Sequence, residues 1–165
     1  MTASRRARKR PVWPVLALGL ALGAGAFSAT PRAATTERIV VDRHTGLALY
    51  GIDPVAYFTD RKPVAGREEF EYRFAGAVWR FDNDGNRAAF VADADIYMPR
   101  YGGYDPVGIA RGKSTAGYPD LWVVHDERLY LFYTAEARQI FIGNPAMMIE
   151  QASARWAAVK SELPE

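Results

Sequence analysis

The segment at residues 86–110, NRAAFVADADIYMPRYGGYDPVGIA, constrains the fold of this chain more than any other part. Its first apolar residues recur at helical spacing, which places Phe90-Val91 on the face expected to be buried. Pro99 prevents that helix from running on. Gly102-Gly103 allows positive φ between two tyrosines, and Asp105-Pro106 is a good N-cap and first turn for another helix. The segment therefore predicts short helices joined by a sharp, tyrosine-rich turn.

Strands are predicted on both sides of this segment. Apolar and charged residues alternate before and after Ala75-Gly76, which is typical of an antiparallel hairpin with a turn at those two residues. A second hairpin is predicted around residues 125–128. Two further short strands are predicted at residues 38–41 and 47–50, on either side of a His-Thr-Gly turn. These patterns predict a small antiparallel sheet made of hairpins.

Helix-start signals complete the predicted fold. An Asp-Pro pair predicts one helical turn at residues 53–58, and a threonine predicts a capped helix at residues 134–142. An Asn-Pro pair predicts a C-terminal helix at residues 145–160, with Ile149, Ala152 and Trp156 sharing one face. We therefore expect an α+β fold in which short helices and a C-terminal helix pack on the hairpin sheet.

Two short segments of the chain echo each other. Gly51-x-Asp53-Pro54-Val55 has the same pattern as Gly103-x-Asp105-Pro106-Val107. Both patterns place an aspartate cap before a proline-started helical turn. No repeat period is visible around them in the sequence, so we interpret the echo as convergence on good helix-start chemistry.

Residues 1–34 have the pattern of a secretory signal peptide. Five basic residues within the first ten are followed by an apolar run, and small residues then extend to Ala34. We expect cleavage between Ala24 and Ala34 and a periplasmic protein with one domain at residues 35–165. The alternative is an uncleaved leader that anchors the protein, which would be its one contact with the membrane.

Charge and cysteine content narrow the function classes. The chain has 21 basic and 19 acidic residues, but six of the basic residues and none of the acidic ones lie at residues 1–34. The remainder is net negative, with 15 basic against 19 acidic residues, and it has no basic stripe that would indicate nucleic-acid binding. The chain has no cysteine, so disulfides and thiol chemistry are excluded.

The motifs together resemble a known family. The helix beginning Asn86-Arg87 and the loop at Tyr101–Tyr104 are similar to the asparagine-arginine helix and tyrosine-glycine-glycine-tyrosine loop of YHS domains, in the exported bacterial branch. The resemblance spans nearly all of residues 38–160. The other matching segments are Gly51–Phe58, Lys62–Gly66, Gly112-Lys113, Trp122–Tyr133 and Asn144-Pro145 leading to Trp156. The resemblance implies metal association by analogy with cysteine-bearing branches, and no settled activity.

One departure from the family pattern concerns Asp105. The exported branch typically carries a cysteine at this position, where this chain has a carboxylate. A carboxylate is a hard ligand and cannot cycle through a disulfide, so a thiol-based function of relatives does not carry over.

The tyrosine-rich loop is the best candidate site. Tyrosine rings, a flexible Gly-Gly backbone and one carboxylate would suit a small ligand or a partner peptide. The alternative is a tyrosine corner that ties the loop to the core, with Arg100 or Lys113 pairing with the carboxylate. The candidate ligand-binding residues are Tyr57, Tyr97, Tyr101, Gly102, Gly103, Tyr104 and Asp105.

Two classes of function follow from this site. The first is a non-enzymatic binding module for a small ligand, a metal-related species or a protein partner. The second is an enzyme or redox accessory in which a Tyr/Asp site replaces the thiol of the family. The missing cysteine favours the first class, and so do the two histidines, His44 and His125, each predicted at a hairpin tip. The pattern of residues predicts no metal ligands, and it identifies neither catalytic residues nor a cofactor.

Overall fold

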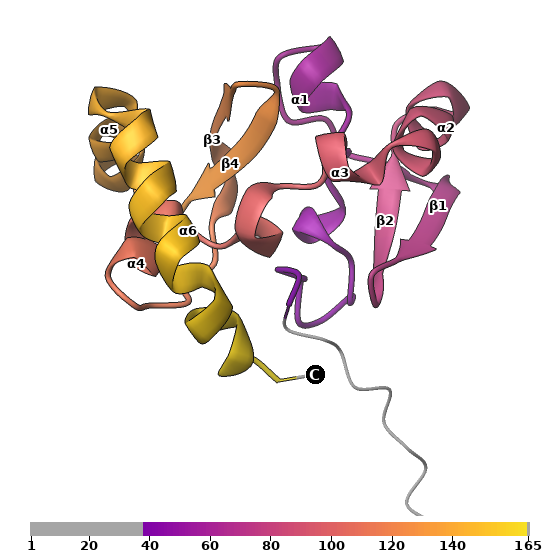
Figure 1. The fold of residues 1–165 in the computed structure, drawn as a ribbon. Helices are drawn as coiled ribbons and strands as arrows, with labels where there is room; N and C mark the ends of the chain where they lie inside the picture. Colours follow the sequence, from indigo (N-terminus) through magenta and orange to yellow (C-terminus); the bar gives the residue numbers. More distant parts are fainter. Residues whose placement is uncertain (1–37, 165) are drawn as a thin grey trace, which may run out of the picture. The chain divides into compact units, whose positions relative to one another are not determined.

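The computed structural model describes residues 38–164, and all of these belong to one compact unit. The predicted α+β class is confirmed, because antiparallel hairpins pack with short helices and a C-terminal helix (Figure 1). The strands form two separate two-stranded sheets rather than one sheet. None of the described helices is long and apolar enough to cross a membrane. The predicted signal peptide lies outside the described residues.

The first hairpin joins β1 (Arg67–Phe74) to β2 (Ala77–Phe81). Its turn is at Ala75-Gly76 as predicted, with φ of 49° and 81°. Alternate residues of β2 are buried, and the ring of Trp79 is completely inaccessible. Since successive side chains of a strand point to opposite faces, this alternation places one face of the hairpin in the core.

The second hairpin joins β3 (Tyr118–His125) to β4 (Arg128–Phe132). Leu129 and Leu131 of β4 pack in one hydrophobic cluster, together with the rings of the first hairpin. Tyr130 and Phe132 pack in another, together with the C-terminal helices. Both faces of β4 are therefore buried, and this strand separates the two cores of the described chain.

Side-chain caps start the three longer helices. The capping oxygen of each accepts the N–H of the residue three positions later, which would otherwise lack a partner. These helices and their caps are α2 (Asp84–Ala92) with Asn83, α5 (Ala135–Gly143) with Thr134, and α6 (Pro145–Ser161) with Asn144. The shorter helices are α1 (Ala56–Thr59), α3 (Ala94–Tyr97) and α4 (Pro106–Ala110). On α6, the predicted face is confirmed, since Ala152 is buried and Ile149 and Trp156 pack against the core.

Two local predictions are wrong. Residues 38–41 and 47–50 form a single antiparallel bridge, Val41 to Ala48, instead of two strands. The cause is the 3-10 turn η1 (Leu49–Gly51), in which positive φ takes the chain out of strand geometry. On α2, Phe90 is buried as predicted, but Val91 is 51% exposed because it faces away from the core.

The structure also contains an internal repeat. Residues 47–92 and 98–143 each run through a 3-10 turn, a short helix, a hairpin and a helix, in the same order. The hairpin strands have 8 and 5 residues in both halves, and the following helix has 9. The interpretation of the Gly-x-Asp-Pro-Val echo as convergence without a repeat is therefore wrong, because the echo occupies the same place in both halves.

Two glycines mark equivalent positions in the repeat. A Cβ atom at Gly66 would lie 2.5 Å from the backbone of Arg80, and one at Gly117 would lie 2.6 Å from the side chain of Leu131. Each of these glycines stands directly before the first strand of its hairpin, and the register of each hairpin shifts soon afterwards. Both hairpins therefore begin with a backbone approach that only glycine permits.

Candidate functional site

The predicted tyrosine-rich turn is the 3-10 turn η2 (Arg100–Gly103). Positive φ occurs at Gly102 and Gly103, at 64° and 93°, as their pattern predicts, and also at Tyr101, at 56°. A Cβ atom at Gly102 would collide with the carbonyl oxygen of Arg38. The Gly102 carbonyl in turn accepts the N–H of Val40 at 2.8 Å. The turn is therefore sharp, and the strand-like segment before η1 lies directly against it.

Asp105 caps α4 as predicted. Its Oδ1 accepts the N–H of Val107 at 2.8 Å and that of Gly108 at 3.4 Å, while its Oδ2 accepts the N–H of Tyr133 at 3.0 Å. The residue is only 3% exposed. No ion pair of the described residues joins Asp105 to Arg100 or Lys113, the alternative partners named from the sequence. Backbone N–H groups therefore satisfy this buried carboxylate.

The first half of the repeat places Asp53 in the same role. Its Oδ1 accepts the N–H of Val55 at 2.8 Å, and its Oδ2 accepts the N–H of Asp82 at 2.8 Å. Asp82 follows β2 as Tyr133 follows β4. The side chain of Asn86 adds a further hydrogen bond to Asp53 at 2.7 Å. Both aspartates therefore tie the end of a hairpin to the start of a short helix.

The structure does not bring the four tyrosines of the candidate site together in one hollow. Tyr57 is 1% exposed, packs in the core of the first hairpin and donates its hydroxyl to the Pro119 carbonyl at 3.1 Å. Burial raises the pKa of Tyr57 well above its ordinary value, and the carboxylates of Asp120 and Asp53 raise it further. Tyr101 packs in the other core.

The hydroxyl of Tyr101 contacts the C-terminal helix. It lies 3.2 Å from the Ile149 carbonyl oxygen and 3.0 Å from the Ser153 hydroxyl. The ring of Tyr97 packs edge-on against Phe58 at 5.4 Å between centroids. These two tyrosines are held by packing, which is the structural role that the sequence left open as the alternative.

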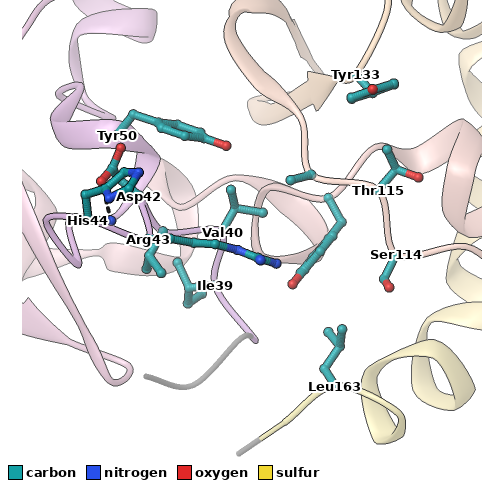
Figure 2. A pocket seen from close by; sticks show the side chains of 13 residues that line it. Ile39, Val40, Asp42, Arg43, His44, Tyr50, Ser114, Thr115, Tyr133 and Leu163 are labelled. Carbon is teal, nitrogen blue, oxygen red and sulfur yellow. Dashed lines mark hydrogen bonds between the residues drawn. The ribbon is translucent and has the colours of Figure 1, made fainter. Parts of the chain in front are cut away.

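Tyr104 is the predicted residue that reaches the larger of two surface hollows. This tyrosine hollow has a volume of about 830 Å³, and Tyr50, Tyr104 and Tyr133 line it together with Arg43 and the segment 114–116 (Figure 2). Figure 2 shows Tyr50 and Tyr133 on separate sides of the hollow, and the arm of Arg43 extending into it below both rings. Its complete lining is Ile39, Val40, Val41, Asp42, Arg43, His44, Tyr50, Tyr104, Ser114, Thr115, Ala116, Tyr133 and Leu163.

Asp105 positions two walls of the tyrosine hollow without lining it. Its carboxylate holds the backbone of Tyr133, and its own N–H donates to the Thr115 carbonyl at 2.8 Å. Tyr104, the residue before it, forms an antiparallel bridge with Ala116. Asp105 therefore acts as a support for the hollow.

Tyr50 reaches the hollow from the first 3-10 turn. Its φ of 57° in η1 turns the side chain outward, and the residue is 39% exposed. Burial of its hydroxyl raises the pKa of Tyr50, and Tyr118 and Asp42 add to this effect. Tyr133 is 47% exposed and stacks on Tyr118 at 5.5 Å between ring centroids. Tyr50 and Tyr133 were not predicted as site residues, because they lie far apart in the chain and line one hollow only in the folded structure.

Charged groups occupy one rim of the hollow. Asp42 accepts the backbone N–H groups of Thr45 at 2.8 Å and His44 at 2.9 Å, which lowers the pKa of its carboxyl. Arg43 lies between Asp42 and His44 in sequence, and within the described part of the chain it forms no ion pair. Its guanidinium is therefore available to an anionic ligand in the hollow.

The remaining predicted residues lie elsewhere. Tyr101 and Gly102 line a second hollow beside the C-terminal helix, and Tyr57, Tyr97, Gly103 and Asp105 line neither hollow. Within residues 38–164, no group of three or more histidine, aspartate or glutamate side chains is placed to hold a metal ion.

The comparisons with known proteins assign the chain to no family. No family model, curated protein or solved structure matches the chain. The similarity to YHS domains therefore stays a prediction from the motifs, and function is inferred from the geometry of the described residues.

Proposed function

We propose that this chain is an exported, YHS-like binding module that holds a small ligand in the tyrosine hollow without transforming it. One observation carries the proposal: three tyrosines from three separate segments surround a hollow of about 830 Å³, which Arg43 also lines without an ion pair to any described carboxylate. Small-molecule sites commonly have volumes of about 300–1,000 Å³, with apolar walls and a few polar groups. The signal-peptide pattern of residues 1–34 supports export to the periplasm.

The lining groups favour a particular kind of small molecule. Tyrosine rings offer flat apolar surface at a low cost in side-chain entropy, and their hydroxyls add hydrogen bonds. Arg43 would pair with a carboxylate, and the hydroxyls of Ser114 and Thr115 would accept or donate at the opposite wall. A planar ring that carries a carboxylate combines these features. A side chain of a protein partner with the same chemistry would use the same groups.

The alternative of an enzyme or redox accessory at a Tyr/Asp site has less support. Asp105 is buried, and its two oxygens accept three backbone N–H groups. A general acid or base must reach the proton that it moves, directly or through one water molecule. The position of Asp105 suits support of the hollow better than proton transfer. The metal association implied by the family resemblance likewise has no support from the described side chains.

Filling the hollow tests this proposal. Ser114 is exposed at its edge, so Ser114→Trp should occupy the space without burying a polar group. Ser161→Trp on α6 is the matched control, because Ser161 is exposed and lies outside the lining. Native mass spectrometry of protein recovered from the cell envelope should show a bound species in the parent and in the control variant. The Ser114→Trp variant should lack it.

Two results would count against the proposal. A bound species retained by Ser114→Trp would place the ligand elsewhere. The parent protein should also carry a bound species or bind 4-hydroxybenzoate, phenylpyruvate or indole-3-acetate at millimolar concentration. If it does neither, the hollow does not bind an aromatic carboxylate.

A further inference from the structure

A second hollow, the basic hollow, lies beside the C-terminal helix. It has a volume of about 700 Å³ and is lined by residues of α3, η2, β4 and α6. Its charged and aromatic lining residues are Arg38, Asp95, Arg100, Arg128, Lys160 and Trp156. Without counting Arg38, the lining still holds three cationic side chains, Arg100, Arg128 and Lys160, against the one acidic side chain of Asp95, so the hollow is positive.

This positive charge is unusual for the chain. Residues 35–165 have 15 basic and 19 acidic residues, so cations gather here on a chain that is otherwise net negative. Within the described residues, Arg100, Arg128 and Lys160 form no ion pair. Like charges that share a hollow repel each other, and an anion bound between them would relieve this repulsion.

The arginines are held by groups that leave their charge available. The guanidinium of Arg100 lies 5.6 Å from the centre of the Tyr101 ring. Arg128 donates one N–H to the backbone carbonyl of Asp95 at 3.2 Å. A guanidinium has five N–H donors, so the other donors of Arg128 can contact a ligand. Both arginines are therefore oriented by the protein, while no carboxylate of residues 38–164 forms an ion pair with either of them.

Trp156 provides an apolar wall next to these cations. It is partly buried, and its ring packs edge-on against Tyr101 at 5.7 Å and in a tilted arrangement against Tyr104 at 6.3 Å between centroids. These contacts hold the indole on α6, one helical turn from Lys160. A ligand in the basic hollow would therefore meet an aromatic surface beside a cationic one.

We propose that the basic hollow binds an oxyanion group, a phosphate or sulfate ester, whose apolar portion packs on Trp156. Arginine forks bind such tetrahedral groups through paired N–H donors, and lysine adds a point charge. The ester can belong to a soluble small molecule or to the headgroup of an anionic lipid, since both present the same chemistry. This site is separate from the tyrosine hollow, so it does not depend on the function proposed for that hollow.

Phenyl phosphate is the probe for this site. Residues 35–165 contain three tryptophans, and the indole N–H signal of Trp156 in a ¹⁵N NMR spectrum reports on the basic hollow. Titration of the exported protein with phenyl phosphate should move that signal in a saturable way and leave those of the buried Trp79 and the partly buried Trp122 nearly unchanged.

Charge variants test whether phenyl phosphate binding depends on the residues of the basic hollow or only on the positive charge of the protein surface. Arg100→Gln/Lys160→Gln removes two charges from the basic hollow, and Lys62→Gln/Lys113→Gln removes two exposed charges outside it. The first pair should weaken phenyl phosphate binding about tenfold or more, and the control pair less than about twofold. All four side chains are exposed, so both variants should fold, and thermal unfolding checks this. Equal weakening by both pairs, or a Trp156 signal that does not move, would overturn the proposal.

Vesicles distinguish the two sources of the oxyanion. Phosphatidylcholine vesicles that contain phosphatidylglycerol should bind the protein in competition with phenyl phosphate if the natural ligand is a lipid headgroup. If these vesicles do not bind while phenyl phosphate does, the ligand is a soluble ester. Vesicle binding that phenyl phosphate and Arg100→Gln/Lys160→Gln both leave unchanged would contradict the assigned site.

Discussion

Asp105 holds Tyr133 through a hydrogen bond of 3.0 Å between its Oδ2 and the tyrosine N–H, at the point where β4 ends. The other oxygen of the same carboxylate caps α4. A single buried side chain thus connects the second hairpin to the loop after η2 and fixes one wall of the tyrosine hollow. Asp53 makes the equivalent connection in the first half of the repeat.

Removing either aspartate should destabilise the protein, and the two costs should differ. Asp105→Ala removes a helix cap and leaves the Tyr133 N–H without its partner, so we expect a loss of about 2–4 kcal/mol in the free energy of unfolding. Asp53→Ala should cost more, because Asp53 also accepts from Asn86, whereas Ala137 occupies the corresponding place in the second half. Urea denaturation measures both.

The control for this comparison is Asn86→Ala. It removes the extra hydrogen bond of Asp53 and leaves the bonds of Asp105 in place, so it should lower the free energy of unfolding by less than Asp53→Ala does. If Asp105→Ala is as stable as the parent protein, the carboxylate does not connect the hairpin to α4 as described.

Side chains at the Gly-Gly turn should be poorly tolerated. Gly102→Ala would push a Cβ atom into the Arg38 carbonyl, and Gly103→Val would place a β-branched residue at a φ of 93°. We expect each to lower the free energy of unfolding by about 2–4 kcal/mol. Tyr50→Gly at the equivalent turn is the control, since Tyr50 already carries a side chain at positive φ. A stable Gly103→Val protein would contradict the sharp turn.

Alkaline pH should destabilise the protein through Tyr57. Its pKa is raised in the folded state, chiefly by burial, so the folded protein holds this proton more tightly than the unfolded chain does. The corresponding stability is present below the ordinary tyrosine pKa of about 10 and is lost as the pH rises above it. Chemical denaturation between neutral pH and pH 11 should show this loss in the parent. A Tyr57→Phe variant with the same slope would assign the effect to other groups.

If the leader directs export, its removal should give the mature protein a new N-terminus. Protein taken from the cell envelope should begin after a cleavage between Ala24 and Ala34, because small residues follow the apolar run there. N-terminal sequencing decides this. Membrane-bound protein that still begins at Met1 would favour the anchored alternative.

Local backbone chemistry explains what the sequence could predict. The cap and proline at Asp105-Pro106, the turn at Ala75-Gly76 and the glycines of η2 each act over a few residues, so their effect can be read without the fold. The two hairpins and the C-terminal helix followed from apolar periodicity for the same reason. The prediction of strands at residues 47–50 failed because positive φ at Leu49 and Tyr50 is not signalled by these residue types.

The repeat and the tyrosine hollow depend on contacts between distant residues. The two halves share few identical residues beyond the Gly-x-Asp-Pro-Val echo, because a strand face needs only apolar side chains of suitable size. Trp79 in one half therefore corresponds to Tyr130 in the other, and the sequence around them does not show that the two positions are equivalent. The grouping of Tyr50, Tyr104 and Tyr133 likewise requires the folded arrangement of both halves.

Chemical-shift mapping tests ligand binding in the tyrosine hollow most directly. Titration of the ¹⁵N-labelled exported protein with 4-hydroxybenzoate should move the backbone amide signals of Tyr50, Thr115 and Tyr133 together, and Arg43→Gln should weaken the binding about tenfold. Arg61→Gln, which removes an exposed charge outside the hollow, should leave it unchanged. Signals that move only around the basic hollow, or equal weakening by both variants, would contradict the proposed function.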